Sequence, residues 1–498
     1  MSIATTADLE VTPPHPLLKP LACAAACVAL ADWLFYGWQI GISLALFLGA
    51  LGIVAVVSNR ACAPRNIRIA MGVVFAAVLI ALLEDVSFLS TILGVLGTGL
   101  FIVVVTTREP ASWRRNLLEV LAAPFRGPFH LAADLIRGMR RENYPWLKLD
   151  SLVGWIVPLV IFSIFVWLFA SANPLIEQGL LKVDLSALTN LLNPGRMLFW
   201  IVMAGVIWPL ILRRRKPKSI AQTEMRADAA KPPSDLDFLL GEKATLRSLI
   251  LFNALFALQS GLDLTYLWGG VNLPDGMSHA EYAHRGAYPL IVTALLAAGF
   301  VLVAMRRSGP AEKSRLIRPL VLVWTGQNIL LVISAIFRLD LYVAAFSLTY
   351  LRLAALIWMM LVAIGLVLIL IQIWRKKSNS WLVSANAATL ALVLYGCCFI
   401  NTPRLVASYN LEHSQEVAGT GPKLDMRYLT SLGPQALPVL EPHVKEFPAL
   451  WPIVMDLRSN RFARSGNWRA WSFQSWRLDR YLANNPNAPP NPGSSGKG

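Results

Sequence analysis

The side chains best placed to do chemistry are polar residues inside apolar stretches that are long enough to cross a membrane. Gln259 and Asp263 are four residues apart in one such stretch and therefore share a helix face. Gln327 and Asn328 lie near the middle of another stretch, and Arg352 lies near the start of a third. Burying an amide or a charge in lipid costs free energy unless the group is paired or serves a function. These residues therefore predict contacts between helices or a polar binding site.

Further polar side chains occupy the segment that follows Asp263. The sequence GGVNLPDGMSHAEYAHRGAYPL contributes Glu281, His284 and Arg285. We expect these groups on the same side of the membrane as Asp263 and Arg352, where an Asp263–Arg352 ion pair is geometrically reasonable. Two interpretations stay open. One is an outward-facing polar site that binds, moves or senses a small solute, and the other is a set of ion pairs that fastens the helices together.

Familiar catalytic and cofactor motifs are absent from the sequence. There is no P-loop, HExxH, GxSxG or GxGxxG pattern, and the five cysteines form no metal-binding cluster with histidine. We therefore expect no cofactor and no metal, assign no catalytic residue and favour a protein that is not an enzyme. The enzymatic alternative is a lipid-linked glycosyl or acyl transferase, which needs a carboxylate base at the outer surface. Glu84 and Asp85 are its candidates, while Asp32 lies within the first apolar stretch.

Long apolar stretches dominate the 498-residue chain, in which 56% of residues are hydrophobic and 15% are charged. About 20 helical residues cross the roughly 30 Å hydrocarbon core of a membrane. The stretches are continuous rather than alternating, which favours helices over a β-barrel. The predicted fold class is all-α, a polytopic transmembrane helix bundle of about 11 spans with a small helical C-terminal extramembrane tail. The predicted spans are 20–36, 38–58, 67–83, 86–106, 151–171, 197–212, 246–268, 288–305, 316–336, 351–374 and 381–400.

Lys and Arg residues concentrate in every second loop of this predicted bundle. Alternate loops, from Arg60 to Lys377, hold 28 of them, and the intervening loops hold four. The positive-inside rule then places the N-terminus in the cytoplasm and the residues from about 401 onward outside the cell. The same distribution accounts for the net charge of +16 without nucleic acid. It predicts that membrane lipids are the partners, with anionic lipid at the cytoplasmic basic loops.

The predicted bundle has two membrane halves, and the first half carries a long basic loop. This loop, 107–150, predicts two short interfacial helices separated at Pro124 and Pro128, and it supports a third interpretation, a structural or scaffold protein. The tail carries a predicted helix break at Gly433 and Pro434. In order, the predicted segments are an N-terminal cytoplasmic segment 1–19, membrane half one 20–212, a flexible basic cytoplasmic linker 213–245, membrane half two 246–400, an extracytoplasmic helical tail 401–480 and a disordered end 481–498.

Four sequence stretches resemble a known family. They are AEYAHRGAYPLIVTALLAAGFVL, RLDLYVAAFSLTYLRLAALIWMMLVAIGLVL, YNLEHS and LDMRYLTSLGPQALPVL. They are similar to the bacterial multi-pass membrane family catalogued as domain of unknown function 4173, over roughly residues 150–440. His284 departs from the arginine expected there. The resemblance implies a helical protein of the bacterial inner membrane, and it implies no catalytic or binding residue because that family has no established activity.

Overall fold

The computed structural model describes residues 17–107, 112–140, 193–213, 242–268, 316–462 and 467–487, together with Val292 and Leu296. Every regular element in these residues is a helix. Nine of the described helices are long and apolar enough to cross a membrane. The prediction of an all-α membrane protein is confirmed at that level. Two of the predicted spans lie outside the described residues, namely 151–171 and, apart from Val292 and Leu296, 288–305. Most of the predicted linker 213–245 also lies outside them.

The chain forms two compact units, and the first comprises residues 1–216 and 467–472. Its apolar core joins α1, α2, α3 and α10, with Leu34, Leu82 and Trp208 almost fully buried. Gly94 of α4 allows close packing, because a Cβ atom there would meet side-chain atoms of Leu82 and Leu48. The membrane-length helices of this unit are α1 (Leu18–Phe35), α2 (Ile42–Asn59), α3 (Arg65–Glu84), α4 (Phe88–Thr106) and α10 (Pro194–Ile211).

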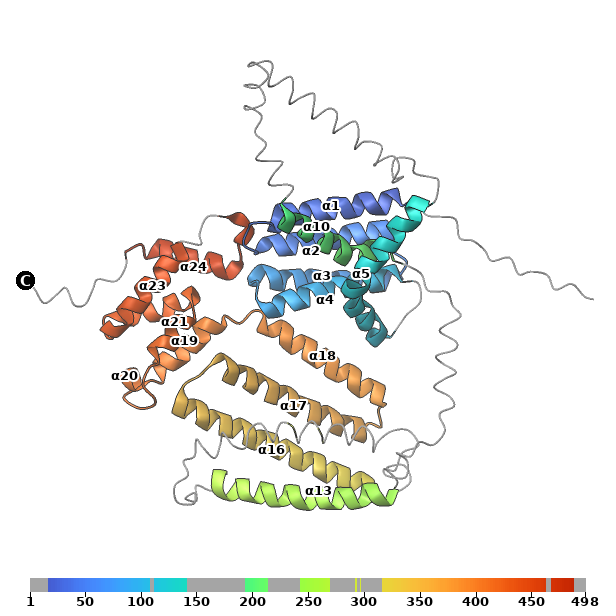
Figure 1. Ribbon diagram of the computed structural model, residues 1–498. Coiled ribbons are helices and arrows are strands. Elements are labelled where there is room, and N and C mark those ends of the chain that lie inside the picture. The colour runs from blue at the N-terminus through green and yellow to red at the C-terminus, as the bar shows by residue number, and fades with distance from the viewer. Residues whose placement is uncertain are drawn as a thin grey trace, which may run out of the picture. The chain divides into compact units, whose positions relative to one another are not determined.

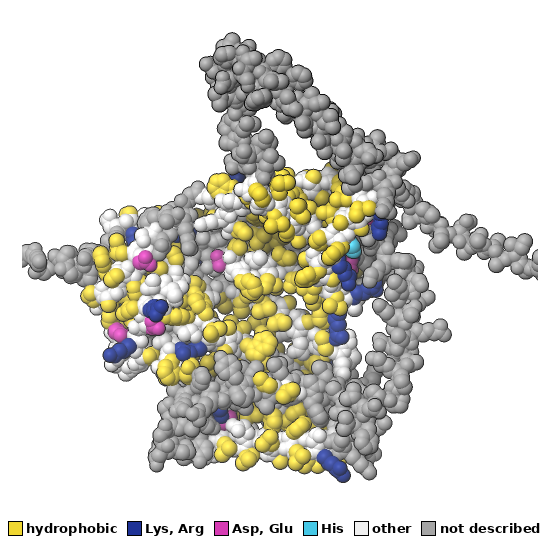
Figure 2. All heavy atoms as spheres, viewed as in Figure 1, with side chains coloured by type: hydrophobic (Ala, Val, Ile, Leu, Met, Phe, Trp, Pro, Cys, Tyr) yellow, Lys and Arg dark blue, Asp and Glu magenta, His cyan; other side chains and the backbone are white. Residues whose placement is uncertain are grey.

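The outer faces of these helices are apolar, as a lipid environment requires. Ile53 and Val57 of α2 and Val73 of α3 are all exposed on the protein surface. Figure 2 shows hydrophobic side chains covering most of the described surface over α1–α4. A water-soluble protein rarely exposes so much contiguous apolar surface. The surface thus supports a location within the membrane independently of the lengths of the helices.

The basic loop forms one helix, so the prediction of two short helices is wrong. α5 (Trp113–Arg140) continues through both Pro124 and Pro128 and runs crosswise to α1–α4 (Figure 1). Proline inside a helix removes a backbone hydrogen bond and usually ends or kinks the helix. Here α5 packs tightly against α10, where a Cβ atom on Gly127 would clash with the Gly205 backbone. This tertiary packing offsets the local cost of the prolines.

A short piece of the C-terminal tail belongs to the first unit. This piece, η6 (Trp468–Ala470), lies against the turn between α1 and α2, where the Ile42 backbone N–H donates a 2.7 Å hydrogen bond to the carbonyl of Trp471. Cation–π attraction adds to this contact. The guanidinium of Arg469 lies within 5.1 Å of three indole centroids, those of Trp33, Trp38 and Trp468.

The second unit places four long helices side by side in the order α13, α16, α17 and α18 (Figure 1). α16 has 30 residues and is therefore about 45 Å long, which exceeds the hydrocarbon thickness. The chain then breaks at Ser347, whose φ of 68° is rare for a residue with a side chain. The helices of this unit are α13 (Glu242–Asp263), continued by the π-helical turn η2 (Leu264–Trp268), and α16 (Ile317–Phe346), α17 (Tyr350–Trp374) and α18 (Asn379–Cys397).

The tail packs on the connection between α16 and α17. Leu348 donates its backbone N–H to Asn410 Oδ1 at 2.6 Å, and Asn410 Nδ2 donates to the Leu348 carbonyl at 2.9 Å. The predicted break at Gly433 and Pro434 is confirmed, because α21 ends at Ser431 and η3 begins at Pro434. Helix continues to Asn484, so residues 481–484 do not belong to a disordered end. The tail elements are α19 (Thr402–Glu412), α20 (Gln415–Ala418), α21 (Met426–Ser431), η3 (Pro434–Ala436), α22 (Leu437–Leu440), η4 (Glu441–Val444), η5 (Pro448–Leu450), α23 (Trp451–Phe462) and α24 (Phe473–Asn484).

Candidate functional site

A line of polar side chains runs along the contact between α13 and α16, and we call this contact the polar seam. It comprises Asn253, Gln259, Ser260 and Asp263 of α13 with Gln327 and Arg338 of α16. Asn253 Nδ2 donates to the Leu320 carbonyl and Gln327 Nε2 donates to the Asn253 carbonyl, both at 3.2 Å. Farther along, Asp263 meets Arg338. Contacts advance in the same direction on both helices, so α13 and α16 run parallel.

Asp263 forms a buried ion pair with Arg338, so the predicted Asp263–Arg352 pair is wrong. The Arg338 guanidinium donates to Asp263 Oδ1, and the two side chains are 3% and 1% exposed respectively. Gln259 Nε2 donates to the same oxygen at 2.9 Å, as expected for residues four apart on one helix. Three polar groups therefore converge within the protein interior at one end of the polar seam.

Arg352 lies elsewhere because the chain breaks between α16 and α17. Its guanidinium donates to the carbonyls of Phe346 and Ser347, which are left without helical partners at the end of α16. The same guanidinium lies 4.5 Å from the ring centroid of Tyr342. Arg352 thus closes the C-terminus of α16 and does not reach Asp263.

Gln327 and Asn328, the two amides predicted to lie in the middle of the membrane, make different kinds of contact. Gln327 faces α13 and belongs to the polar seam. Asn328 instead donates from Nδ2 to the Trp324 carbonyl of its own helix at 2.8 Å, and Thr325 Oγ1 donates to the Val321 carbonyl at 2.7 Å. Asn328 and Thr325 thus bond within α16 and are not part of the polar seam.

The polar seam contains buried oxygen atoms that have no hydrogen-bond partner among the described residues. They are Oδ1 of Asn253, Oγ of Ser260, Oδ2 of Asp263 and Oε1 of Gln327. An unsatisfied buried polar atom costs about 1–3 kcal/mol, so native proteins rarely keep several along one contact between two helices. All four atoms accept hydrogen bonds, and only the serine hydroxyl also donates. The polar seam therefore has unused capacity to bind a donor.

Asp32 in the first unit provides a contrast, because both of its carboxylate oxygens are partnered. Arg196 donates from Nε to Oδ1 at 2.7 Å and from its second guanidinium nitrogen to Oδ2, and Trp200 Nε1 donates to Oδ1 at 2.9 Å. The guanidinium also stacks 5.1 Å from the ring centroid of Tyr36. The Asp32 carboxylate therefore fastens α1 to α10, and it is not available as the carboxylate base of a transferase.

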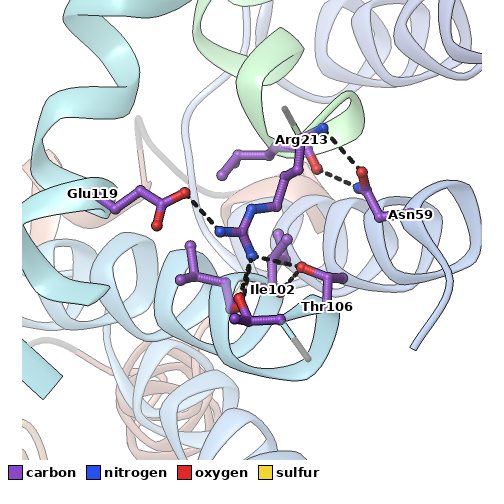
Figure 3. A network of polar contacts seen from close by, with 8 residues as sticks. Asn59, Ile102, Thr106, Glu119 and Arg213 are labelled. Carbon is purple, nitrogen blue, oxygen red and sulfur yellow. Dashed lines mark hydrogen bonds and ion pairs between the residues drawn. The ribbon is translucent and has the colours of Figure 1, made fainter. Parts of the chain in front are cut away.

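Arg213 joins four helices of the first unit through its guanidinium and its backbone N–H (Figure 3). Its guanidinium donates to Glu119 Oε1 of α5 at 2.6 Å and to Thr106 Oγ1 of α4 at 2.7 Å. Its backbone N–H donates to Asn59 Oδ1 of α2 at 2.9 Å, directly after α10. The sequence placed Arg213 in the linker, and only its position at the end of an apolar stretch could have indicated an anchoring role.

The carboxylates proposed for the transferase lie in the turn between α3 and α4. Burial, followed by the charge of Glu84, raises the pKa of Asp85. Ser90 Oγ donates to the Asp85 carbonyl at 2.6 Å and fixes the turn. A raised pKa makes the Asp85 carboxyl hold its proton more readily than an ordinary aspartate does, which keeps Asp85 as a candidate for the transferase.

Three of the predicted site residues, Glu281, His284 and Arg285, lie outside the described residues. Within the described part of the chain, no group of three or more His, Cys, Asp or Glu side chains could hold a metal ion. Arg338 was missed because the sequence assigned it to a short loop. A recognisable signal existed, since Trp324, Asn328, Leu331, Ala335 and Arg338 are all buried at alternating spacings of four and three, the pattern of one helix face.

A family model called Domain of unknown function (DUF4153) matches residues 69–443. The prediction of domain of unknown function 4173 is therefore wrong. The match includes the polar seam and the connection between α16 and α17. Among curated proteins and among solved structures, no match was found.

Proposed function

We propose that this membrane protein, which belongs to the DUF4153 family, binds a small solute at the polar seam between α13 and α16. The observation that carries the proposal is the set of unpartnered oxygens on Asn253, Ser260, Asp263 and Gln327. By contrast, the contacts that join α1 to α10 partner both carboxylate oxygens of Asp32. A protein that binds a small solute, moves it across the membrane or senses it needs such a site for that solute.

The chemistry of the polar seam favours a solute that donates hydrogen bonds. Arg338 already compensates the charge of Asp263, so the site as a whole is close to neutral. The four unpartnered oxygens are hydrogen-bond acceptors, which suit N–H or O–H groups. Ammonium, a small primary amine or a chain of water molecules that carries protons meets this requirement. An anion does not, because the unpartnered oxygens would repel it.

The proposed orientation has the N-terminus in the cytoplasm and the tail outside the cell. Besides the distribution of Lys and Arg, the position of η6 supports it, because η6 lies against the turn between α1 and α2, which is predicted to face outward. Asn410 of the tail likewise binds Leu348, near the end of α16 that carries Arg338. The ion pair would then lie toward the outer surface. Location in a bacterial inner membrane stays a prediction, since it came from the resemblance to a different family.

Thermal unfolding in detergent tests the proposal with ammonium chloride as the probe. Sodium chloride controls for ionic strength, and tetramethylammonium chloride supplies a cation without N–H donors. We expect ammonium alone to raise the unfolding temperature. Ser260→Ala should reduce this increase without lowering the basal unfolding temperature, because it removes an unsatisfied hydroxyl. Thr325→Val is the matched control, since Thr325 Oγ1 is bonded within its own helix. Equal responses to all three salts in every variant would reject the proposal.

One observation favours the transferase as a second candidate. Asp85 has a raised pKa beside Glu84, in a turn outside the membrane-spanning helices. If these carboxyl groups act in proton transfer, Asp85→Asn and Glu84→Gln should each abolish the cellular phenotype in protein that is still folded. An intact phenotype in both variants would leave this candidate without a base, because Asp32 is fully paired.

A further inference from the structure

α5 has one face packed against the rest of the first unit. Val120 lies against Gly99 of α4, where a Cβ atom on the glycine would clash with it. Trp208 Nε1 of α10 donates a 3.0 Å hydrogen bond to Asp134. Glu119 accepts from Arg213, which lies at the end of α10. These contacts fix the rotation of α5 about its axis and determine which side chains face outward.

The opposite face of α5 is apolar and exposed. Phe125 and Phe129 are 77% and 75% exposed. At 100° per residue, this stripe lies about 180° from the packed positions Val120 and Asp134. Exposing several large apolar side chains to water forgoes the free energy of burying them, so we expect another apolar phase to cover them. The exposed members of the stripe are Leu118, Leu121, Phe125, Phe129 and Ile136.

A row of arginines borders this stripe. Arg115, Arg126 and Arg137 recur at intervals of eleven residues, which is about three helical turns, so they occupy one edge of α5. All three are exposed, and Arg137 pairs with Asp134 at 3.6 Å. An apolar face with a basic edge is the pattern of a helix that lies in the plane of a membrane surface.

We propose that α5 inserts its apolar stripe between the acyl chains of one leaflet and binds anionic phospholipid headgroups through its arginines. The location favours lipid over a protein partner. α5 runs crosswise to the spanning helices (Figure 1) and contacts Arg213 at the end of α10, beside Asn59 and Thr106 at the ends of α2 and α4. The membrane surface must lie close to these helix ends. The positive edge of α5 complements anionic headgroups and would repel a basic protein.

Spin-label accessibility in phosphatidylcholine nanodiscs tests the insertion of the stripe. A label at position 129, in a background where the five cysteines are replaced by alanine, should be accessible to oxygen and protected from a water-soluble nickel chelate. A label at Leu392, which is exposed on the membrane-length helix α18, is the lipid-facing control. A label at Ser431 of the tail is the aqueous control. If position 129 responds like Ser431, the stripe faces water or awaits a protein, and the proposal fails.

Native mass spectrometry with added phosphatidylglycerol tests the role of the arginines. Each arginine near a charged surface contributes about a fivefold increase in lipid affinity. The double variant Arg115→Gln/Arg126→Gln should therefore bind phosphatidylglycerol about 25-fold more weakly, with phosphatidylcholine binding unchanged. Arg404→Gln/Arg427→Gln in the tail removes the same charge from exposed positions and is the matched control. Equal losses in the two double variants would mean that net charge alone governs binding and would overturn the assignment to α5.

Discussion

The buried Asp263–Arg338 pair gives the sharpest quantitative prediction. Both side chains are almost completely buried, so removing one leaves a charge without its partner in the protein interior. Such a change typically costs about 3–5 kcal/mol, whereas replacing both charges with apolar groups costs much less. Asp263→Leu and Arg338→Leu should therefore each lower the free energy of unfolding by about 3–5 kcal/mol. The double variant should be less destabilised than the sum of the two by about 3 kcal/mol or more.

Reversible unfolding by sodium dodecyl sulfate in mixed micelles, followed by circular dichroism, measures this coupling. Arg352→Leu supplies the control, because Arg352 bonds to the end of α16 and not to Asp263. Its effect should add to that of Asp263→Leu within about 0.5 kcal/mol. Additive effects of Asp263→Leu and Arg338→Leu would refute the pairing, and coupling of Asp263 to Arg352 would restore the pair expected from the sequence.

Three further outcomes follow from local contacts. Gly41→Ala should detach η6 and increase its proteolysis, because the new Cβ atom would lie 2.6 Å from Ala470 Cα. Asn410→Leu should lower the free energy of unfolding by about 2–4 kcal/mol in chemical denaturation, because both backbone groups of Leu348 lose their partner. The raised pKa of Asp85 means that the folded state favours the protonated carboxyl and loses stability as pH rises through that pKa. Asp85→Asn should therefore raise the unfolding temperature at neutral pH and flatten this decline.

The sequence predicts the membrane helices well because their signal is local. Each of the nine described helices that are long enough to cross a membrane overlaps a predicted span, since about 20 continuous apolar residues leave the backbone no other conformation in lipid. The shared helix face of Gln259 and Asp263 was predictable for the same reason, because helical spacing alone determines it. Boundaries were less predictable. α16 extends ten residues beyond its predicted end at 336, where the apolar signal is interrupted by Arg338 and Asp340.

Features that depend on tertiary contacts were not predictable from the sequence. α5 continues through two prolines because Gly127 and Gly205 allow close packing with α10, and these two glycines are far apart in the sequence. Arg338 rather than Arg352 pairs with Asp263 because the turn at Ser347 separates α16 from α17. Arg213 joins four helices through acceptors contributed by distant residues. The sequence shows which residues are polar, and their spacing indicates which of them share a helix face. Only the fold determines the partners of these residues.

Infrared difference spectroscopy offers the most direct test that the polar seam binds a hydrogen-bond donor. Exchanging sodium for ammonium over a film of the reconstituted protein should shift a carboxylate stretching band, because Asp263 Oδ2 gains a partner. The shift should persist in Asp32→Asn, whose carboxylate is already satisfied in the wild type, and disappear in Asp263→Asn. A band that remains in Asp263→Asn, or the lack of any ammonium-specific band in the wild type, would contradict the proposed site.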